Sequence, residues 1–232
     1  SFSDYDLFAV DSGSTDGTFQ ALEKSGCELE QISPDAYIPG KVMNDAIART
    51  DHDIIVLLNA DAIPQSDDWL EQLLLPILGN QADATFSKQI ARPDAAFVVQ
   101  YDYERAYNPE KILPGFFSAV ACAFKRELWT RTPFREEGYA EDVAWAEACV
   151  AGGARFRLVE KSVVEHSHNY SLKGLFQKRY RQAESLAQKA LQYGGTNRTL
   201  KRDCWTQIAK SRAATGDRQG ADTARRQASQ FE

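Results

Sequence analysis

The first group of polar residues that could do chemistry begins at Asp11, directly after an apolar run. A carboxylate there can accept hydrogen bonds from the N–H of a nucleobase or from a ribose hydroxyl, but it cannot cradle phosphates as a nest of glycine amides does. Asp11, Ser12 and Gly13 therefore favour a nucleoside as the ligand. The alternative is that Asp11 and Asp16 only shape a turn and cap the helix that follows.

A second group, Asn59-Ala60-Asp61, follows the most apolar segment of the chain, residues 53–58. Asn59 and Asp61 both offer hard oxygen atoms, which are the ligands that Mg²⁺ and Mn²⁺ prefer. These cations commonly bind through one or two protein groups together with the phosphates of a substrate. The group predicts a divalent-cation site, although so short a motif is not specific when taken alone.

Two adjacent acids, Glu141 and Asp142, stand at the start of a helix predicted over 141–151. The amides at the start of a helix stabilise a carboxylate and keep it ionised, so one of these acids could serve as a base. The alternative is that the pair only complements the charge of the helix end.

His166 and His168 are two of the three histidines and lie at the end of a short predicted strand. On an extended strand the two side chains lie on opposite faces, so only one of them would reach any given metal ion. The alternative for either residue is a buried histidine with a purely structural role.

The elements that must hold these groups follow from the apolar periodicity of the chain. Strands are predicted over 6–10, 28–32, 53–58, 84–90 and 118–124 and in two short segments ending at His166; helices are predicted over 15–25, 41–50, 67–78 and 141–151 and from Leu172 onward, with breaks at Gly194-Gly195 and near Gly216-Asp217. Alternating strands and helices predict an α/β fold with a mostly parallel sheet.

Further local expectations complete this outline. Ser14 and Ser66 are the expected caps of the helices that follow them, and the run 53–58 is expected to be a central parallel strand buried on both faces. The first βα unit with which nucleotide-binding α/β domains open looks absent, because the first predicted strand already leads into the Asp11 turn. Residues 91–117 form an aromatic-rich, proline-punctuated stretch of the kind that often carries function.

Composition places the chain among soluble globular proteins. It has 232 residues, of which 43% are apolar, and this is ordinary for a folded domain. Neither an apolar run of membrane-spanning length nor the layout of a signal peptide is found, so we expect a cytoplasmic protein that is at most peripheral to a membrane. The four cysteines show no CxxC spacing, which favours free thiols over a zinc ribbon or a disulfide framework.

Charge is distributed unevenly along the chain. From Ser171 to the end there are thirteen basic and five acidic residues, against fourteen and twenty-eight before it. A basic tail attracts phosphate groups, whereas the acidic body would repel nucleic acid, so we expect contact with an anionic membrane surface and none with nucleic acid. The basic residues expected on this surface are Lys173, Lys178, Arg181, Lys189, Arg198, Lys201 and Arg202. The alternatives are a solvated face, or a helical extension that packs or dimerises through Trp205 and Ile208.

The four polar groups, taken in order, make residues 5–175 resemble family 2 glycosyltransferases, which have the GT-A fold. Further segments resemble the bacterial rhamnosyltransferase branch of that family, which builds cell-surface polysaccharides. These segments are Lys88-Gln89, Phe116-Phe117-Ser118, Tyr139-Ala140-Glu141-Asp142 and the run from Val163 to Ser171. The resemblance implies a catalytic domain over 1–170 and a basic helical extension over 171–232.

The resemblance also implies a reaction and the residues that perform it. A metal-dependent, inverting enzyme would move a sugar, with rhamnose as one option, from a nucleotide-diphospho-sugar to a saccharide or lipid-linked saccharide in polysaccharide or lipopolysaccharide synthesis. The implied donor-binding residues are Asp11, Ser12, Gly13, Lys41, Asn44, Asn59, Ala60 and Asp61. The resemblance assigns Mn²⁺ or Mg²⁺ to Asp61 and His166, with His168 as the alternate ligand, and the base to Asp142, with Glu141 as the next candidate.

Two other functions remain open on the sequence. Asn59 stands where the family's metal motif has its first acid, which would suit a protein that binds a nucleotide sugar, or a regulatory partner, without turnover. A nucleotidyltransferase would carry a glycine-rich basic loop for a triphosphate near its N-terminus, and no such loop occurs in the sequence.

Overall fold

The computed structural model describes residues 5–112, 116–136, 141–168 and 197–231, together with scattered residues between 174 and 191. The chain forms two compact units. The first comprises the described residues up to Pro93 and those from Gln100 to Ser167, and it contains both sheets. The second comprises 94–99 and the described residues from His168 on. The division expected after residue 170 remains a prediction.

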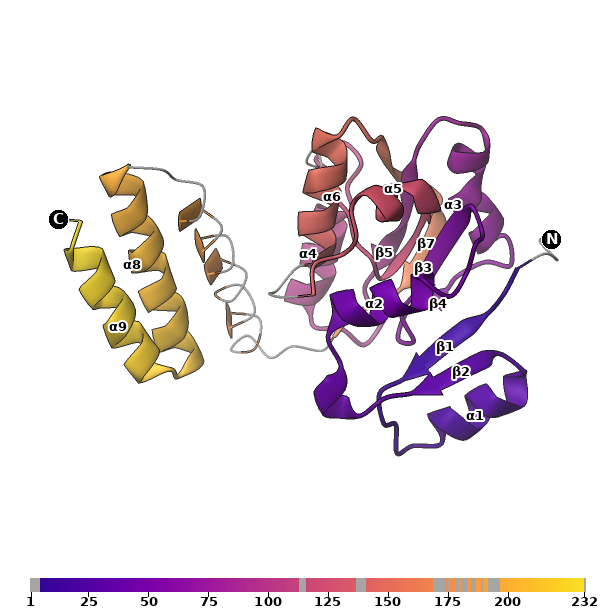
Figure 1. The fold of residues 1–232 in the computed structure, drawn as a ribbon, viewed down its shortest axis with the longest axis horizontal. Coiled ribbons are helices and arrows are strands. Elements are labelled where there is room, and N and C mark those ends of the chain that lie inside the picture. The colour runs from indigo at the N-terminus through magenta and orange to yellow at the C-terminus, as the bar shows by residue number, and fades with distance from the viewer. Residues whose placement is uncertain are drawn as a thin grey trace. The chain divides into compact units, whose positions relative to one another are not determined.

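The first unit alternates strands and helices along the chain (Figure 1). Its elements are β1 (Phe8–Asp11), α1 (Thr18–Ser25), β2 (Glu28–Gln31), a 3₁₀ turn (Pro34–Ala36), α2 (Pro39–Ile47), β3 (Ile54–Leu58), β4 (Ile63–Pro64), α3 (Trp69–Leu78), β5 (Ala84–Ile90), α4 (Phe97–Ala106), β6 (Ala121–Lys125), α5 (Arg126–Arg131), α6 (Glu141–Ala151) and β7 (Phe156–Glu165). By the clustering of contacts, the first residues of α4 are counted with the second unit.

The strands form two sheets. Strands β1 and β2 pair in parallel, and a five-stranded sheet has the order β3-β6-β5-β7-β4. Only β5 and β7 are parallel in the larger sheet, and its other three pairings are antiparallel. The prediction of an α/β fold is therefore right, but the larger sheet is mixed rather than mostly parallel, because β6 runs back between β3 and β5.

Strand β3 is the element whose environment differs most from expectation. It lies at one end of the larger sheet, where its partner among the described strands is the antiparallel β6. Ile55 is buried, but Val56 and Leu58 are 37% and 45% exposed. The prediction that residues 53–58 form a central parallel strand buried on both faces is therefore wrong. An apolar run does not reveal which strands will flank it in the sheet.

Helices cover both faces of the larger sheet with separate apolar clusters. Helix α3 buries Trp69, Leu73, Leu74 and Ile77 against the alanines and valines of β6 and β7 on one face. On the opposite face, Trp145 of α6 lies among aromatic rings that include Phe86, Phe117 and Phe124. Apolar residues at helical spacing along α3 and α6 thus fix both helices to the sheet, and Figure 1 shows the sheet between them.

Local details modify four further expectations. Helix α1 begins at Thr18 rather than Thr15, and Asp16, not Ser14, accepts the Thr18 amide at 3.1 Å. Helix α3 begins with Asp68 as its N-cap residue, and Ser66 contributes its carbonyl oxygen to the Trp69 amide. The aromatic-rich stretch 91–117, for which no helix was predicted, contains α4, and the two short strands expected before His166 are one strand, β7.

The pairing of β5 with β7 contains an irregularity. Ser87 pairs with Val159, but the next residue, Lys88, pairs with Val163. The extra length of β7 includes Ser162, whose hydroxyl lies 2.8 Å from that of Ser87, and Ser87 also accepts a hydrogen bond from the Trp69 indole. Buried polar groups are therefore paired where the regular ladder is interrupted.

Asp83 ties together the starts of β5 and β7 and the end of β6. Its carboxylate accepts hydrogen bonds from Lys125 Nζ at 2.8 Å, Arg155 Nε at 2.9 Å and the Arg155 amide at 3.0 Å. The Arg155 side chain is the largest cause that holds the pKa of Asp83 well below its usual range. This carboxylate is thus stabilised in its charged form by the folded chain.

We expect Asp83→Asn to lower the free energy of unfolding at pH 7 by about 2–3 kcal/mol, because hydrogen bonds to a charged group are lost. Because the pKa of Asp83 is lower in the folded chain than in the unfolded chain, the charged carboxylate stabilises the folded state at pH values above the unfolded-state pKa of about 4. This stabilisation is lost as the pH falls towards the pKa of the folded state. Urea unfolding at pH 7 and at pH 3 measures the difference, which should shrink at pH 3. Asp51→Asn is the control, since the Asp51 side chain is fully exposed. An equal loss in the control, or an undiminished difference at pH 3, would contradict the expectation.

The second unit contains two helices that pack against each other, α8 (Arg198–Thr215) and α9 (Arg218–Ser229). Asn197 caps α8 by accepting the Leu200 amide at 3.0 Å, and Asp217 caps α9 by accepting the Gly220 amide at 2.8 Å. The break predicted near Gly216-Asp217 is confirmed. Ile208 is buried between the helices and Trp205 packs at the edge of the same cluster.

The basic surface expected on this unit is only partly described. Lys173, Lys178, Arg181 and Lys189 lie outside the described residues, as does the break expected at Gly194-Gly195. Within α8, Arg202 pairs with Asp203 at 3.0 Å and Lys201 lies over the ring of Phe231. Within the described residues, no helix has both the length and the apolar character needed to cross a lipid bilayer. The four cysteine thiols are free, as predicted.

Candidate active site

The predicted metal ligands Asp61 and His166 meet at one edge of the larger sheet. Asp61 lies in the turn that follows β3, which is held by hydrogen bonds from the Asn59 amide to Val120 and from the Ala62 amide to Asn59. His166 follows β7, and its amide donates to the Ile90 carbonyl at 2.9 Å. Strands β3 and β7 run in the same direction, so their carboxyl ends bring His166 Nε2 within 3.5 Å of Asp61 Oδ2.

The other nitrogen of His166 faces a glutamine. Nδ1 lies 2.9 Å from Gln89 Oε1 and 3.3 Å from the hydroxyl of Tyr103. An amide oxygen only accepts, so in this arrangement Nδ1 carries the proton and donates to Gln89. The Nε2 lone pair then lies on the side of Asp61.

The donor set fits a divalent cation. Asp61 and His166 belong to a group of side chains, within the described residues, that could hold a metal ion. Carboxylate oxygen and imidazole nitrogen suit Mn²⁺, with phosphate oxygens of a substrate completing the coordination. His168, two residues further along, is counted with the second unit, and its role as the alternate ligand remains a prediction.

The predicted base and its neighbour begin α6. Asp142 accepts the Val143 amide at 2.8 Å and the Ala119 amide at 3.4 Å. These amides favour the charged form, as the sequence predicts, but burial outweighs them and raises the pKa of Asp142. Burial also raises the pKa of Glu141. A carboxylate with a raised pKa is the stronger proton acceptor, which suits a general base.

A continuous series of contacts connects the base with the metal ligands. Gln89 Nε2 donates to the Ser118 hydroxyl at 2.9 Å, while the next residue, Ala119, donates its amide to Asp142. Residues 118 and 119 therefore position His166, through Gln89, and Asp142 at the same time. Asp61, His166 and Asp142 thus belong to one connected arrangement built from β5, the start of α6, and the segments that follow β3, precede β6 and follow β7.

Tyr37 also lies near this arrangement, just before α2. Partial burial raises its pKa, and the negative charges of Glu141 and Asp61 raise it further. Two acids that come from different elements, the α6 start and the β3 turn, thus act on the same phenol. The side chain is half exposed, so it is accessible to a ligand.

The Asp11 loop holds its own carboxylate firmly. Asp11 Oδ2 accepts the amides of Gly13 and Ser14 and the side-chain amide of Gln31. The Gln31 side chain is the largest cause that lowers the pKa of Asp11 to about 2, ahead of the bonds from Ser14 and Gly13. Gly13 has φ +86°, a conformation that favours glycine. The turn-shaping interpretation of Asp11 is therefore supported, and contact of Asp11, Ser12 or Gly13 with a nucleobase remains a prediction.

The two predicted donor residues on α2 are engaged within the protein. Lys41 pairs with Asp45 at 2.5 Å along the same helix. Asn44 Oδ1 accepts from the Trp129 indole and the Phe134 amide, and its Nδ2 donates to the Phe134 carbonyl. Asn44 thus ties α2 to the segment that leads to α6. A role of either residue in donor binding remains a prediction, as it does for Asn59 and Ala60.

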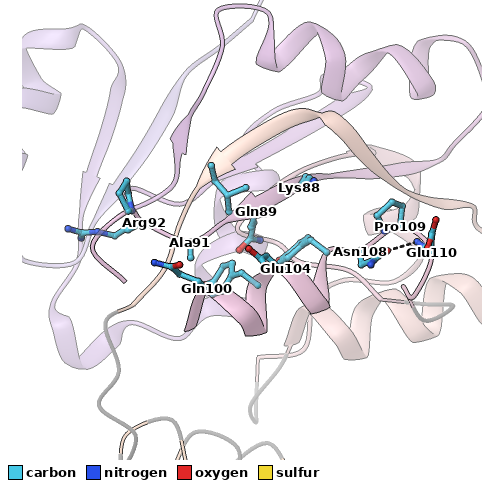
Figure 2. A pocket seen from close by; sticks show the side chains of 13 residues that line it. Lys88, Gln89, Ala91, Arg92, Gln100, Glu104, Asn108, Pro109 and Glu110 are labelled. Atoms are coloured by element: carbon cyan, nitrogen blue, oxygen red, sulfur yellow. Dashed lines mark hydrogen bonds between the residues drawn. The ribbon is translucent and has the colours of Figure 1, made fainter. Parts of the chain in front are cut away.

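A cavity of about 870 Å³ lies between the end of β5 and α4, next to residues that contact His166. Gln89 and Tyr103, which contact His166, also line the cavity, and Figure 2 shows its labelled side chains in a row from Arg92 to Glu110. Its charged and amide lining residues are Lys88, Gln89, Arg92, Gln100, Glu104, Asn108 and Glu110. The lining carries as many acids as cations, which suits a neutral polar ligand.

Three residues of the site were not predicted from the sequence. Gln89 lies in the Lys-Gln pair that contributes to the resemblance, but no role follows from its type. Tyr103 lies in the stretch expected to be functional, but the helix that presents it was not recognised. Tyr37 precedes the predicted α2 without any motif. Two signals in the sequence could have directed attention to them: the Lys-Gln pair for Gln89 and the aromatic-rich stretch 91–117 for Tyr103.

Comparison with known families and curated proteins gives a consistent result. The model of a family described as Glycosyl transferase family 2 matches residues 1–138. The O-antigen chain rhamnosyltransferases WbaN of Salmonella anatum and RfbN of Salmonella typhimurium are each 26% identical over 74% of this chain. These matches cover 59% and 60% of the two relatives, so the chain spans about three fifths of their length.

Solved structures share the fold. The mannosyltransferase PcManGT from Pyrobaculum calidifontis, in complex with GDP-Man and Mn²⁺, has a TM-score of 0.59 and 22% identity, over 94% of this chain and 64% of its own. Glucosyl-3-phosphoglycerate synthase from Mycobacterium tuberculosis, in complex with Mn²⁺, UDP-Glc and phosphoglyceric acid, has a TM-score of 0.55 and 24% identity, over 81% and 68%. These likenesses confirm the predicted GT-A fold.

Proposed function

Because the chain belongs to glycosyl transferase family 2, we propose that it moves a sugar from a nucleotide-diphospho-sugar to a hydroxyl group of a saccharide acceptor, with inversion at the anomeric carbon. The observation that carries this proposal is the approach of Asp61 Oδ2 to His166 Nε2, at 3.5 Å, together with the series of contacts that links His166 through Gln89, Ser118 and Ala119 to the partly buried Asp142. Metal ligands and a base are the two kinds of group that such a transfer requires.

Asp142 acts as the base in the proposed reaction. It takes the proton from the acceptor hydroxyl as the acceptor oxygen forms a bond to the anomeric carbon. The bond from that carbon to the diphosphate oxygen breaks on the opposite face, and its electron pair leaves with the diphosphate. The diphosphate needs no proton to depart, so one carboxylate suffices, unlike in glycoside hydrolysis, where a carboxylic acid assists the leaving group.

Asp61 and His166 would hold the divalent cation, for which we propose Mn²⁺ or Mg²⁺. When bound, the cation neutralises charge on the diphosphate as it leaves. The two enzymes of known structure described above were solved with Mn²⁺, and this supports Mn²⁺ as the first choice in experiments. Tyr37 lies within reach of the charges of Asp61 and Glu141, so its hydroxyl is available to orient the substrates.

We propose a rhamnosyl donor and an acceptor from cell-surface polysaccharide synthesis. The names of the two Salmonella relatives support this choice, and the balanced charge of the cavity beside His166 supports a neutral saccharide as its occupant. The rim formed by Arg92, Glu104 and Asn108 offers donors and acceptors for sugar hydroxyls. A cytoplasmic location with peripheral contact between the basic tail and an anionic membrane remains part of the proposal.

A donor screen by thermal shift tests the proposed function. With Mn²⁺ present, one nucleotide-diphospho-sugar of a panel that includes dTDP-rhamnose should raise the Tm by about 5–10 °C at a hundred times its Kd. EDTA should abolish the shift, and the free sugar should give none. A panel without any shift would overturn the proposal. A shift without release of nucleoside diphosphate, when saccharide acceptors are added, would instead favour a binding protein without turnover.

A further inference from the structure

We infer that Gln89 is a positioning residue, whose amide oxygen fixes the tautomer and the ring orientation of His166. The inference rests on the proposed function, because it concerns the metal site of Asp61 and His166. It assigns a task in that site to a residue of β5 that does not itself contact the cation. Through Gln89, the middle of the sheet determines which nitrogen of His166 is presented to Asp61.

The Gln89 side chain is held in place by hydrogen bonds at both of its polar atoms. Its side chain is 3% exposed and joins His166 Nδ1, at 2.9 Å, to the Ser118 hydroxyl, at 2.9 Å. The backbone holds both ends as well, because Gln89 pairs with Val164 in the β5–β7 ladder and the His166 amide donates to Ile90. A side chain bonded at both polar atoms and buried by its neighbours has little freedom to turn.

The direction of the hydrogen bond decides the chemistry. With Nε2 of Gln89 donating to Ser118, the Oε1 atom faces the ring and can only accept, so His166 must carry its proton on Nδ1. The Nε2 lone pair is then available on the Asp61 side, as a metal ligand must be. The Tyr103 hydroxyl, at 3.3 Å, is further from Nδ1 and could act either as donor or as acceptor, so it does not select the tautomer.

Because the site is buried, removal of the Gln89 amide would leave the Nδ1 donor of His166 without an acceptor. His166 is 6% exposed and Ser118 is 9% exposed. Water has little access to replace a missing acceptor there, and a buried donor without a partner is unfavourable. A chain without the amide would therefore lose the preference for the tautomer that binds a cation, although Asp61 and His166 would both still be present.

Binding of Mn²⁺ alone, followed by the electron paramagnetic resonance signal of the free ion, tests the inference. Gln89→Leu should weaken Mn²⁺ binding by about 10- to 100-fold, as expected when the partner of a metal-bound histidine is removed. Gln89→Glu keeps an acceptor facing Nδ1 and should bind Mn²⁺ within about threefold of wild type. The matched control is Thr85→Val on the same strand, which loses a buried hydrogen bond to Leu73 on the α3 side and should bind Mn²⁺ as wild type does.

The outcomes separate the inference from the proposed function. Wild-type affinity in Gln89→Leu, or equal weakening in Thr85→Val, would overturn the role of Gln89 and leave the metal site standing. A wild-type protein that binds no Mn²⁺ would overturn the metal site and the inference together. Should Gln89→Leu fail to fold, long-range ¹H–¹⁵N spectra of the wild type decide the matter, because a His166 ring without a proton on Nδ1 in the metal-free protein would contradict the inference.

Discussion

Replacing Asp142 by asparagine should lower the turnover of sugar transfer by about 10²- to 10⁴-fold, the contribution typical of a general base. Donor affinity in the presence of Mn²⁺ should stay close to that of the wild type, because a base acts on the acceptor and contributes to the transition state. Asparagine keeps the size of the side chain, and its one oxygen can still accept the Val143 amide, the shorter of the two bonds at 2.8 Å, while the longer bond from the Ala119 amide to the other oxygen is lost. The loss is therefore one of proton acceptance rather than of packing.

The measurement combines turnover, by release of nucleoside diphosphate, with donor binding by calorimetry. Glu141→Gln is the paired control, since it changes the neighbouring acid at the same helix end. Retention of more than about a tenth of wild-type turnover in Asp142→Asn would show that another group is the base, and a large loss in Glu141→Gln would identify it.

The pH dependence offers an independent check on Asp142. Burial raises the pKa of Asp142, and the residue accepts a proton only in its charged form. The rate of sugar transfer should therefore fall as the pH is lowered through this raised pKa, because Asp142 becomes protonated. The fall should begin at a pH above the pKa of about 4 that is usual for aspartate. Asp142→Asn should lose this limb of the profile.

The second large effect is expected for Asp61→Ala, which should abolish measurable binding of the nucleoside diphosphate whose sugar form the donor screen selects. Asp61 supplies the carboxylate that faces His166 Nε2. Without a cation held there, the negative charges of the diphosphate and of the acids at the site would repel each other. Calorimetry should show binding to the wild type with Mn²⁺ and none with EDTA. The variant should show none in either condition.

Asp67→Ala is the control for the loss of one negative charge, because Asp67 is exposed in the loop before α3. It should bind the diphosphate as the wild type does. If the wild type binds equally well with Mn²⁺ and with EDTA, the metal assignment fails, and Asp61 and His166 are structural residues.

Much of the fold follows from signals that are local in the sequence. The bounds predicted for β5 and α6 coincide with the structure. In α6 the start is marked by two acids, and the end is marked by Gly153, which adopts φ +90°. The resemblance to family 2 glycosyltransferases implied that Asp61 and His166 lie close together, and the structure places them after strands that run in the same direction.

Features that depend on contacts between distant segments could not be predicted. An apolar run such as Ile54–Leu58 has the same letters at the end of a sheet as at its centre, so the position of β3 required knowledge of where β6 would insert. Gln89 is an ordinary polar residue until β7 brings His166 beside it. The effect of burial on Asp142 likewise exceeds that of its local amides, and burial is a property of the assembled fold.

The irregularity between β5 and β7 makes the site depend on the length of a strand as well as on its residues. Between the pairs Ser87–Val159 and Lys88–Val163, β5 advances by one residue and β7 by four. The additional residues 160–162 therefore act as a spacer that determines which residue of β7 arrives beside Ile90, where the His166 amide binds. A change in the number of these residues would shift His166 along Ile90 whatever side chains they carry, and this constraint on chain length is one that no single residue reveals.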